Sequence, residues 1–420
     1  MLKKSTLALA VLVALAGCEK AQTPTQSTDT APAAVAEVKT LTSGIELSNM
    51  DTSVKPQQDF FRYVNGNWLA KTEIPADKGR WGSFDELREN ADKQVLAIVQ
   101  ELAAKTAEPG SDTQKIADFY RSYMDTATLD NLGLEPLKAD FAKVDALTSH
   151  ADLAKLWGEL QAYRTGTPVV LFVGQDQKAS DQYITLANQS GLGMPDRDYY
   201  LNTDEKSKEI QQKYQAYITK VAELAGWAEP AKVATTVYAI ESKLAAAQWS
   251  RVQNRDRNAT YNKLTVAQLA ETAPGFDWAV LLGAAKLADV NEVVVRQPTY
   301  LTAFAKLQSE IPLADWQTYL KFHMVRASSE LLASSFDQAS FEFYGKTLSG
   351  LEAQREREKR AVAALEDSLG FMLGKMYVER HFKPEAKERM DQMIKNMRVA
   401  FKEALSLIHI SEPTRRTPIS

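Results

Sequence analysis

Apolar residues recur at intervals of three and four along most of this chain, which is the spacing of an amphipathic helix. The stretch 95–102 shows this most clearly and predicts a long helix with one buried face. We expect this helix to begin at Ser83, because 83–86 reads Ser-Phe-Asp-Glu, the form of a capping box. Similar patterns predict helices at about 112–126, 151–164, 204–226, 229–248, 312–334, 352–380 and 384–405. The sequence therefore predicts a mainly α fold with a large multi-helix domain.

Two runs rich in β-branched and aromatic residues interrupt the helical pattern, at 168–173 and 181–186. A polar loop separates them, so the pair predicts a small β-hairpin inside the helical domain. A third short β-rich run covers 292–296. Nearer the N-terminus, the dipeptide Asn-Gly at 65–66 is a turn signal.

The N-terminal segment has the layout of a bacterial export signal. Lys3 and Lys4 precede an apolar run at 7–16, which is too short to span a bilayer as a mature helix. The run ends at 15–18 in Leu-Ala-Gly-Cys, which resembles the lipobox of bacterial lipoproteins. Cys18 is the single cysteine of the chain, so it has no partner for a disulfide within the chain. Lipidation of Cys18 is the preferred interpretation, and the alternative is a buried free cysteine beside a cleavable secretory signal.

These features predict a signal peptide at 1–17 and attachment to the bacterial envelope through lipid on Cys18. Glu19 follows the cysteine where Asp would favour retention in the inner membrane, so we expect the outer membrane, facing the periplasm. The segment 19–44 is rich in Thr, Ala, Pro, Gln and Ser and contains no aromatic residue, which predicts a flexible tether over 18–44.

The last residues, 407–420, abandon the apolar spacing of the helix predicted before them. One interpretation is a disordered tail. The string LIHISEPTRRTPIS also resembles the translation of a sequencing adapter joined to an incomplete gene. We prefer this second interpretation, and we then expect the natural chain to continue beyond Ser406 with other residues.

Charge and motif content exclude several classes of function. The chain carries 50 Lys plus Arg against 54 Asp plus Glu, interspersed and without a basic stripe, so nucleic acid is not an expected partner. None of the four histidines stands in an HExxH motif, and Pro384 interrupts the helix that would bring His381 and Glu385 together. Neither a G-x-S-x-G elbow nor a GxxxxGK[ST] loop occurs. The sequence therefore offers no catalytic residue and no metal ligand of its own.

Five segments, taken in order, resemble the front part of the neprilysin family of zinc endopeptidases, which includes the endothelin-converting enzymes and bacterial oligopeptidases. They are DFFRYVNGNW at 59–68, IPADKGRWGSFDELR at 74–88, GLGMPDRDYYL at 191–201, RNATYNKLT at 257–265 and LGFMLGKMYVERHF at 369–382. The resemblance implies that 45–88 is the start of an incomplete catalytic domain and leads into a connecting helix. It also implies that 89–406 is a helical domain that covers the cleft.

In that family, zinc is held by HExxH and ExxxD motifs that lie after the region of resemblance, and the substrates are oligopeptides. The resemblance therefore implies zinc in the complete enzyme, a missing C-terminal catalytic half, and neither bound zinc nor activity in this chain. The leading hypothesis is the N-terminal, non-catalytic portion of an envelope lipoprotein zinc metalloendopeptidase. The alternative is a non-enzymatic helical lipoprotein that binds peptides.

Arg80, Phe84 and Arg88 match family positions that contact the substrate. Phe84 and Arg88 would lie one helical turn apart on one face, and guanidinium groups can bind a peptide carboxylate through two hydrogen bonds. Without the resemblance, Arg88 would be interpreted as a solvated helix charge. The segment 196–199 is interpreted as a structural turn, and the charge run at 355–360 as the exposed face of a long helix.

Overall fold

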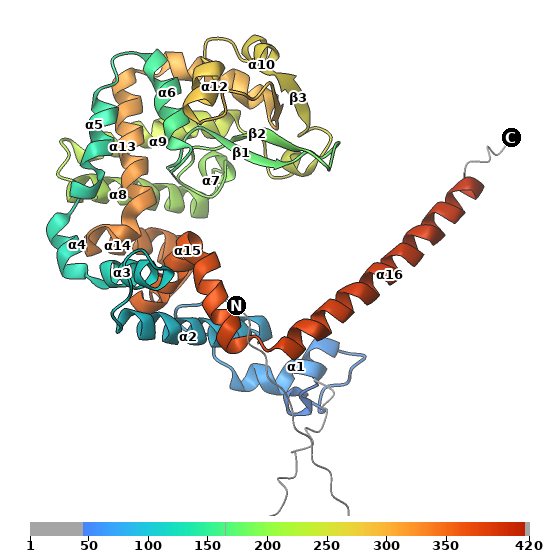
Figure 1. Cartoon of the computed structure of the whole chain (residues 1–420). Helices are drawn as coiled ribbons and strands as arrows, with labels where there is room; N and C mark the ends of the chain where they lie inside the picture. The colour runs from blue at the N-terminus through green and yellow to red at the C-terminus, as the bar shows by residue number, and fades with distance from the viewer. Residues whose placement is uncertain (1–44, 164, 416–420) are drawn as a thin grey trace, which may run out of the picture. The chain divides into compact units, whose positions relative to one another are not determined.

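The computed structural model describes residues 45–163 and 165–415, and the chain divides into two compact units between Thr72 and Glu73. Figure 1 shows that helices make up most of the second unit, with one small sheet. The prediction of a mainly α fold with a small β element is therefore confirmed. The predicted signal peptide, Cys18 and the tether lie outside the described residues, and the predicted domain bounds and foreign tail stay predictions.

The described part of the first unit contains the 3-10 helix η1 (Leu47–Asn49) and helix α1 (Phe60–Lys71). The Asp59 carboxylate caps α1 by accepting the Arg62 amide at 2.9 Å. The turn predicted at 65–66 is wrong, because both residues lie within α1. A side chain at Gly66 would collide with that of Asp51, so this glycine serves close packing rather than a turn.

The sheet of the second unit has four strands in the order β1-β2-β4-β3. Strands β1 (Val169–Gln175) and β2 (Tyr183–Gln189) form the predicted antiparallel hairpin, with Phe172 opposite Leu186. Strand β4 (Glu292–Val295), the predicted third run, pairs in parallel with β2. Strand β3 (Asn262–Thr265), which was not predicted, covers the other edge of β4 in an antiparallel arrangement.

Helices account for most of the remaining described residues of the second unit. They are α2 (Ser83–Ala103), α3 (Asp112–Met124), α4 (Thr126–Leu132), α5 (Lys138–Asp145), α6 (His150–Leu160), α7 (Asp198–Leu201), α8 (Glu205–Leu224), α9 (Pro230–Ala247), α10 (Val266–Thr272), α11 (Trp278–Ala284), α12 (Pro298–Glu310), α13 (Leu313–Ser328), α14 (Ser334–Ser340), α15 (Arg357–His381) and α16 (Pro384–Arg415). The unit also contains the 3-10 helices η2 (Glu135–Leu137), η3 (Gln253–Arg255) and η4 (Ser329–Leu331) and the π-helix η5 (Phe341–Leu348).

Three predicted helices differ most from their observed bounds. The helix predicted at 312–334 ends as α13 at Ser328, and the helix predicted at 384–405 continues as α16 to Arg415. The helix predicted at 352–380 begins only at Arg357. The reason is that the backbone amides of Glu352 and Ala353 both donate to the carbonyl of Ala76 at 3.0 Å, which holds this segment outside a helix.

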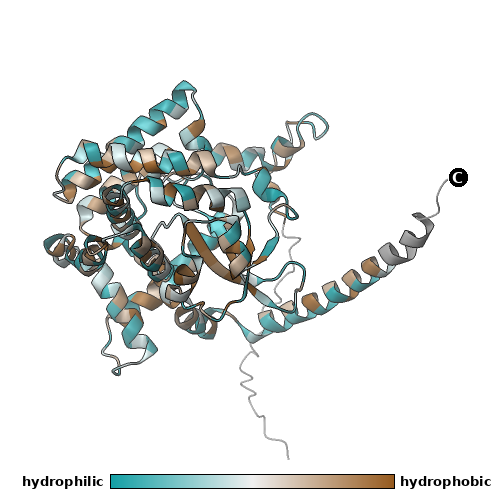
Figure 2. Ribbon diagram, turned by 90° about the horizontal axis from the view of Figure 1, so that it is seen from above, coloured by the Kyte–Doolittle hydropathy of each residue, from teal (hydrophilic) through white to brown (hydrophobic). Residues whose placement is uncertain are grey.

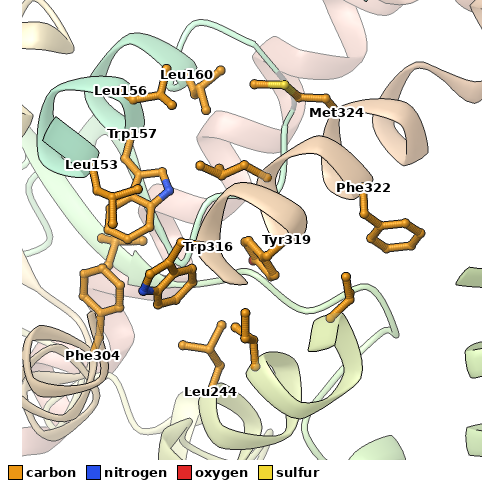
Figure 3. Packing of buried hydrophobic residues seen from close by; sticks show 14 of the residues in the cluster. Leu153, Leu156, Trp157, Leu160, Leu244, Phe304, Trp316, Tyr319, Phe322 and Met324 are labelled. Carbon is orange, nitrogen blue, oxygen red and sulfur yellow. The ribbon is translucent and has the colours of Figure 1, made fainter. Parts of the chain in front are cut away.

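The larger hydrophobic core joins α6, α9, α12 and α13 and contacts the sheet. At its centre, Trp157 of α6 meets Trp316 of α13 edge-on, with ring centroids 5.2 Å apart, and Phe304 of α12 at 5.3 Å. Figure 3 shows these rings pointing toward one another, with Leu244 of α9 close by. Such aromatic contacts favour defined geometry, so the elements that carry them are held in fixed register.

A second, separate core joins α2, α3 and α15. The residues of the predicted stripe on α2, Val95, Ile98, Val99 and Leu102, are all buried here. Ala361, Val362 and Leu365 of α15 face them. The apolar spacing at 95–102 therefore predicted the buried face of α2 correctly.

A buried polar cluster lies inside the larger core, around the carboxylate of Glu241 on α9. This carboxylate has no exposed surface and accepts hydrogen bonds from Tyr200 at 2.7 Å and Tyr214 at 3.0 Å. His323 Nε2 lies 2.8 Å from Oε1 of this carboxylate, the oxygen that also accepts from Tyr214. His323 Nδ1 accepts from Arg326 Nε at 3.3 Å, so the ring proton lies on Nε2 and points to Glu241. The charge of Glu241 is thus fully hydrogen-bonded.

The same cluster holds the backbone of the 191–194 loop. The Tyr200 hydroxyl accepts the amides of Gly193 and Met194 at 3.1 and 2.9 Å while it donates to Glu241. Tyr319 donates to the Gly191 carbonyl at 2.6 Å, and Tyr344 of η5 donates to the Gly193 carbonyl at 3.0 Å. Burial raises the pKa of Tyr200 well above 10, so its hydroxyl keeps its proton and its role as donor.

Replacement of Gly193 by Ala should destabilise the second unit. A methyl group there would collide with the hydroxyl of Tyr214, which is fixed by its bond to Glu241. We expect a loss of about 1–3 kcal/mol in the free energy of unfolding, measured by chemical denaturation. The matched control is Gly283→Ala in α11, where an added methyl group meets open space and should be neutral or slightly stabilising. Equal stability of the two variants would contradict this account.

Acid should destabilise the protein through His323. Burial lowers the pKa of His323 below the ordinary 6.5, so the unfolded chain takes up this proton more readily than the folded one. The free energy of unfolding should therefore fall as the pH drops through about 6.5. His323→Gln should be less stable than the native chain at neutral pH but should lose less further stability on acidification. Denaturation midpoints measured above and below this pH give the dependence of stability on pH for the native chain, for His323→Gln and for the exposed control His381→Gln. The same pH dependence in the native chain and in His323→Gln would contradict the assignment to His323.

Candidate functional site

Helix α2 begins at Ser83 as predicted, but the predicted capping box is wrong. Gly82 is the N-cap residue, and no side chain caps the helix. The backbone of Gly82 is extended, and its carbonyl accepts the Glu86 amide at 3.0 Å, so Ser83 is already the first helical residue. Asp85 and Glu86 lie in the first turn, where negative charge interacts favourably with the helix dipole.

Phe84 and Arg88 lie on the face of α2 that carries its buried stripe. Further along the helix this face is covered by α3 and α15, but its first two turns are not. Phe84 is 87% exposed and Leu87 is 65% exposed. Arg80, Phe84, Leu87 and Arg88 together form what we call the α2 surface, an exposed patch that combines apolar side chains with two cations.

The two arginines of the α2 surface pair with different carboxylates. Arg80 Nε lies 3.8 Å from Asp85 on the first turn of the helix. Arg88 lies 3.9 Å from Asp92 and 3.6 Å from Glu366 of α15. The structure therefore gathers the three predicted site residues at one end of α2, but it does not bring the two guanidinium groups to a shared acceptor. Both side chains are mostly exposed and keep donors for a ligand.

Carboxylates and cations behind Arg88 form a half-buried network that the sequence alone did not reveal. Asp92 accepts Arg355 at 2.6 Å in addition to its contact with Arg88. Burial raises the pKa of Glu366, and the nearby Asp92 raises it further, against the lowering effect of Arg88 and Arg355. The spacing of Arg88 and Asp92, one helical turn apart, was the only sequence signal for this network.

The interpretation of 355–360 as a solvated helix face is wrong. Its cations point inward and are at most 23% exposed. Lys359 pairs with Glu89 of α2 at 2.7 Å, and Arg360 pairs with Asp337 of α14 at 2.8 Å. The error has a physical reason: these partners lie far away in the sequence, so no local spacing could indicate them. The run joins the start of α15 to α2 and α14.

The three histidines whose side chains the structure describes have structural environments. His323 is buried on Glu241, His150 contacts the Ile311 carbonyl at 2.7 Å, and His381 packs on the ring of Tyr377. Within 45–163 and 165–415, no group of three His, Cys, Asp or Glu side chains is placed to hold a metal ion. Among the helices of these ranges, none combines the length and apolar composition needed to cross a membrane.

The segment 191–201, whose charges invite interpretation as a site, is tied to the fold by its backbone. The Tyr200 hydroxyl holds two of its amides, and Arg197 donates to the carbonyl of Gln248. Asp196 accepts the amide of Asp198 at 2.7 Å, which closes the turn expected at 196–199.

Comparison with known proteins gives a consistent result. The sequence profile described as peptidase family M13 matches residues 56–419. Endothelin-converting enzyme 1 of Rattus norvegicus is 29% identical over 432 residues, covering 99% of this chain and 56% of that protein. The human enzyme of the same name is 29% identical over 391 residues, covering 90% of this chain and 50% of that protein. The chain thus spans about half the length of the curated relatives it matches.

Solved structures agree with this assignment. Mycobacterium tuberculosis zinc metalloprotease ZMP1, in complex with an inhibitor, is 36% identical with a TM-score of 0.80, covering 87% of this chain and 55% of that one. PepO from Lactobacillus rhamnosis, at 18% identity and a TM-score of 0.72, shares the fold over 84% of this chain and 56% of its own. The family predicted from five sequence segments is confirmed, and this chain belongs to peptidase family M13, the zinc metalloendopeptidases related to endothelin-converting enzyme.

Proposed function

We propose that this chain is the N-terminal portion of an envelope zinc metalloendopeptidase that hydrolyses oligopeptides, and that it supplies substrate contacts rather than catalytic groups. The family membership carries this proposal, together with the coverage of about half of each relative. The exposed α2 surface supports it, because its apolar rings and chains and its two guanidinium groups are accessible to a ligand on one end of the helix.

Zinc belongs to the family, but the residues of this chain do not fit it. The sequence contains neither HExxH nor ExxxD in the required setting, and the described residues form no metal-binding group. A zinc ion bound by the complete enzyme would polarise the scissile carbonyl and activate water. No step of that reaction is assigned to residues of this chain.

The α2 surface is suited to holding a peptide. Guanidinium groups form short, charge-assisted hydrogen bonds with carboxylates, worth about 1.5–3 kcal/mol each. Arg80 and Arg88 are exposed enough to make them with a peptide carboxylate, and Phe84 offers an apolar face for a side chain. In this role the two arginines orient the substrate, and Glu366 and Asp92 hold Arg88 in place.

Helix α16 offers a second surface with no apolar cover among the described residues. Figure 2 shows hydrophobic residues repeating along this helix. Met393, Met397 and Phe401 lie at intervals of four and are 47%, 62% and 66% exposed. We propose that a catalytic half, which the relatives' greater length provides, covers this stripe.

Attachment to the envelope is part of the proposal. The lipobox at 15–18, the single cysteine and the tether at 18–44 support a lipid anchor at Cys18 in the outer membrane, facing the periplasm. The competing proposal is a non-enzymatic helical lipoprotein that binds peptides. Reading the genomic DNA beyond codon 406 separates the two: an open frame with HExxH and ExxxD supports the enzyme, and a native stop codon supports the binding protein.

The purified 420-residue chain should contain no stoichiometric zinc and should not hydrolyse peptides. The product of an extended gene should bind zinc and hydrolyse peptides. The reason is that the sequence contains no HExxH motif and that the residues which the structure describes form no group able to hold a metal ion. Elemental analysis after gel filtration, with a quenched fluorescent peptide as substrate, makes the comparison. One tightly bound zinc per chain in the purified 420-residue protein would overturn the assignment of zinc to a missing half.

Loss of the α2 surface should weaken peptide binding in the extended enzyme. Arg88→Gln and Phe84→Ala should each raise KM by roughly tenfold with a smaller effect on kcat, because they remove contacts to the bound peptide and leave the zinc site intact. Matched controls are Arg257→Gln and Tyr183→Ala, which remove an exposed cation and an exposed aromatic ring elsewhere. Unchanged KM in both site variants would argue against peptide contact at α2.

A further inference from the structure

A polar recess of about 370 Å³ lies in the second unit, and the residues that line it are far from α2 in the sequence. The end of β2, the loop that follows it, the segment after α9 and the residue after β4 surround this recess. Its lining includes Asn188, Arg197, Gln248, Arg251, Asn254 and Arg296. Its volume falls in the range of small-molecule sites, roughly 300–1,000 Å³, but its walls are polar rather than apolar.

Side-chain amides around the recess bond to one another and fix its walls. Gln297 donates to Asn188 at 3.0 Å and to Asn254 at 2.8 Å. Gln248, which is 5% exposed, donates to the Ser190 carbonyl at 2.8 Å. Their hydrogen-bonding capacity is thus largely used within the protein, and the recess is held open by a connected network rather than by mobile side chains.

The cations of the recess, in contrast, outnumber its acids. Three arginines line it against one carboxylate, Asp196, which pairs with Arg251 at the exposed rim. Arg197 donates to the Gln248 carbonyl and lies 3.9 Å from Asp198. For Arg296, no ion pair is found among the described residues. The recess therefore carries excess positive charge.

Two of these cations have donors that lack an acceptor. The Nε–H groups of Arg197 and Arg296 are buried, and neither has a hydrogen-bond partner in the described part of the chain. A buried donor without an acceptor is unfavourable, and more so on a charged group. Two such donors at one recess indicate a place where an external acceptor with negative charge would be stabilised. Arginine suits this role because its planar fork matches carboxylate and phosphate oxygens.

We propose that this recess is a binding site for a small oxyanion, a carboxylate or a phosphate, held by Arg296 with help from Arg197 and Arg251. Arg296 is the central contact because its charge is not offset within the described residues, and Arg251 closes the rim. This site is separate from the α2 surface and does not depend on the proposed peptidase function. It would let the helical domain respond to an anionic small molecule or to an acidic group on a larger one.

Isothermal titration of the full chain with inorganic phosphate, and separately with succinate, tests the site at constant ionic strength. We expect one anion to bind per chain and to raise the melting temperature, and the preferred probe tells a tetrahedral from a carboxylate ligand. Arg296→Gln should weaken binding by roughly 10- to 100-fold, the effect of one charge-assisted pair. Arg257→Gln, an exposed cation outside the recess, should bind as the native chain does.

A second variant tests the site at a position where the substitution is not expected to disturb folding. Arg296 is half-buried, so Arg251→Gln, at a side chain 63% exposed, removes charge from the rim with little risk to the fold and should weaken binding severalfold. Circular dichroism confirms the fold of each variant. Absence of binding by both anions at millimolar concentration, or equal affinity in folded Arg296→Gln and Arg257→Gln, would overturn the proposal.

Discussion

A single buried carboxylate, that of Glu241, is the interaction on which the larger part of the structure depends. A charge with no exposed surface is tolerated only when it is fully hydrogen-bonded, and here tyrosines from α7 and α8 and a histidine from α13 satisfy it. Tyr200 also holds the 191–194 backbone through two hydrogen bonds, and that loop forms one wall of the arginine-lined recess. One polar group in the core thus fixes the relative position of four helices, α7, α8, α9 and α13, and a loop.

Much of the fold followed from the sequence because its helices are long and strongly patterned. The stripe at 95–102 and the hairpin at 168–186 express local periodicity, which a single sequence displays. Strand β3 was missed because its residues, Asn-Lys-Leu-Thr, lack the run of β-branched side chains that marked β4, Glu-Val-Val-Val. The charges at 355–360 and the dipeptide at 65–66 were misinterpreted for another reason: their roles are set by Glu89, Asp337 and Asp51, residues brought near only by the fold.

In the candidate site, too, the sequence predicted local features, while contacts between distant residues became known only from the structure. Periodicity placed Phe84 and Arg88 on one face of α2, but only the family resemblance suggested that they contact a substrate. The structure adds that this face is the uncovered end of a buried stripe, and that Arg88 is held by two carboxylates from different helices. The recess was out of reach of sequence reasoning, because its three arginines come from separate segments and their spacing carries no period.

The parallel pairing of β2 with β4 has a consequence for the order of folding. Thr185 pairs with Val293, so the whole segment from α7 to α11 must be made and arranged before the central strands can meet. At synthesis rates of about 5–20 residues per second, roughly 5–20 s pass between the synthesis of β2 and that of β4, and the edge of β2 stays unpaired during this time. An open edge invites pairing with other chains. A shorter version of this protein that ends before β4 would lack the strand that covers this edge of β2, so we expect it to pair with other chains more readily than a version that extends past Val295.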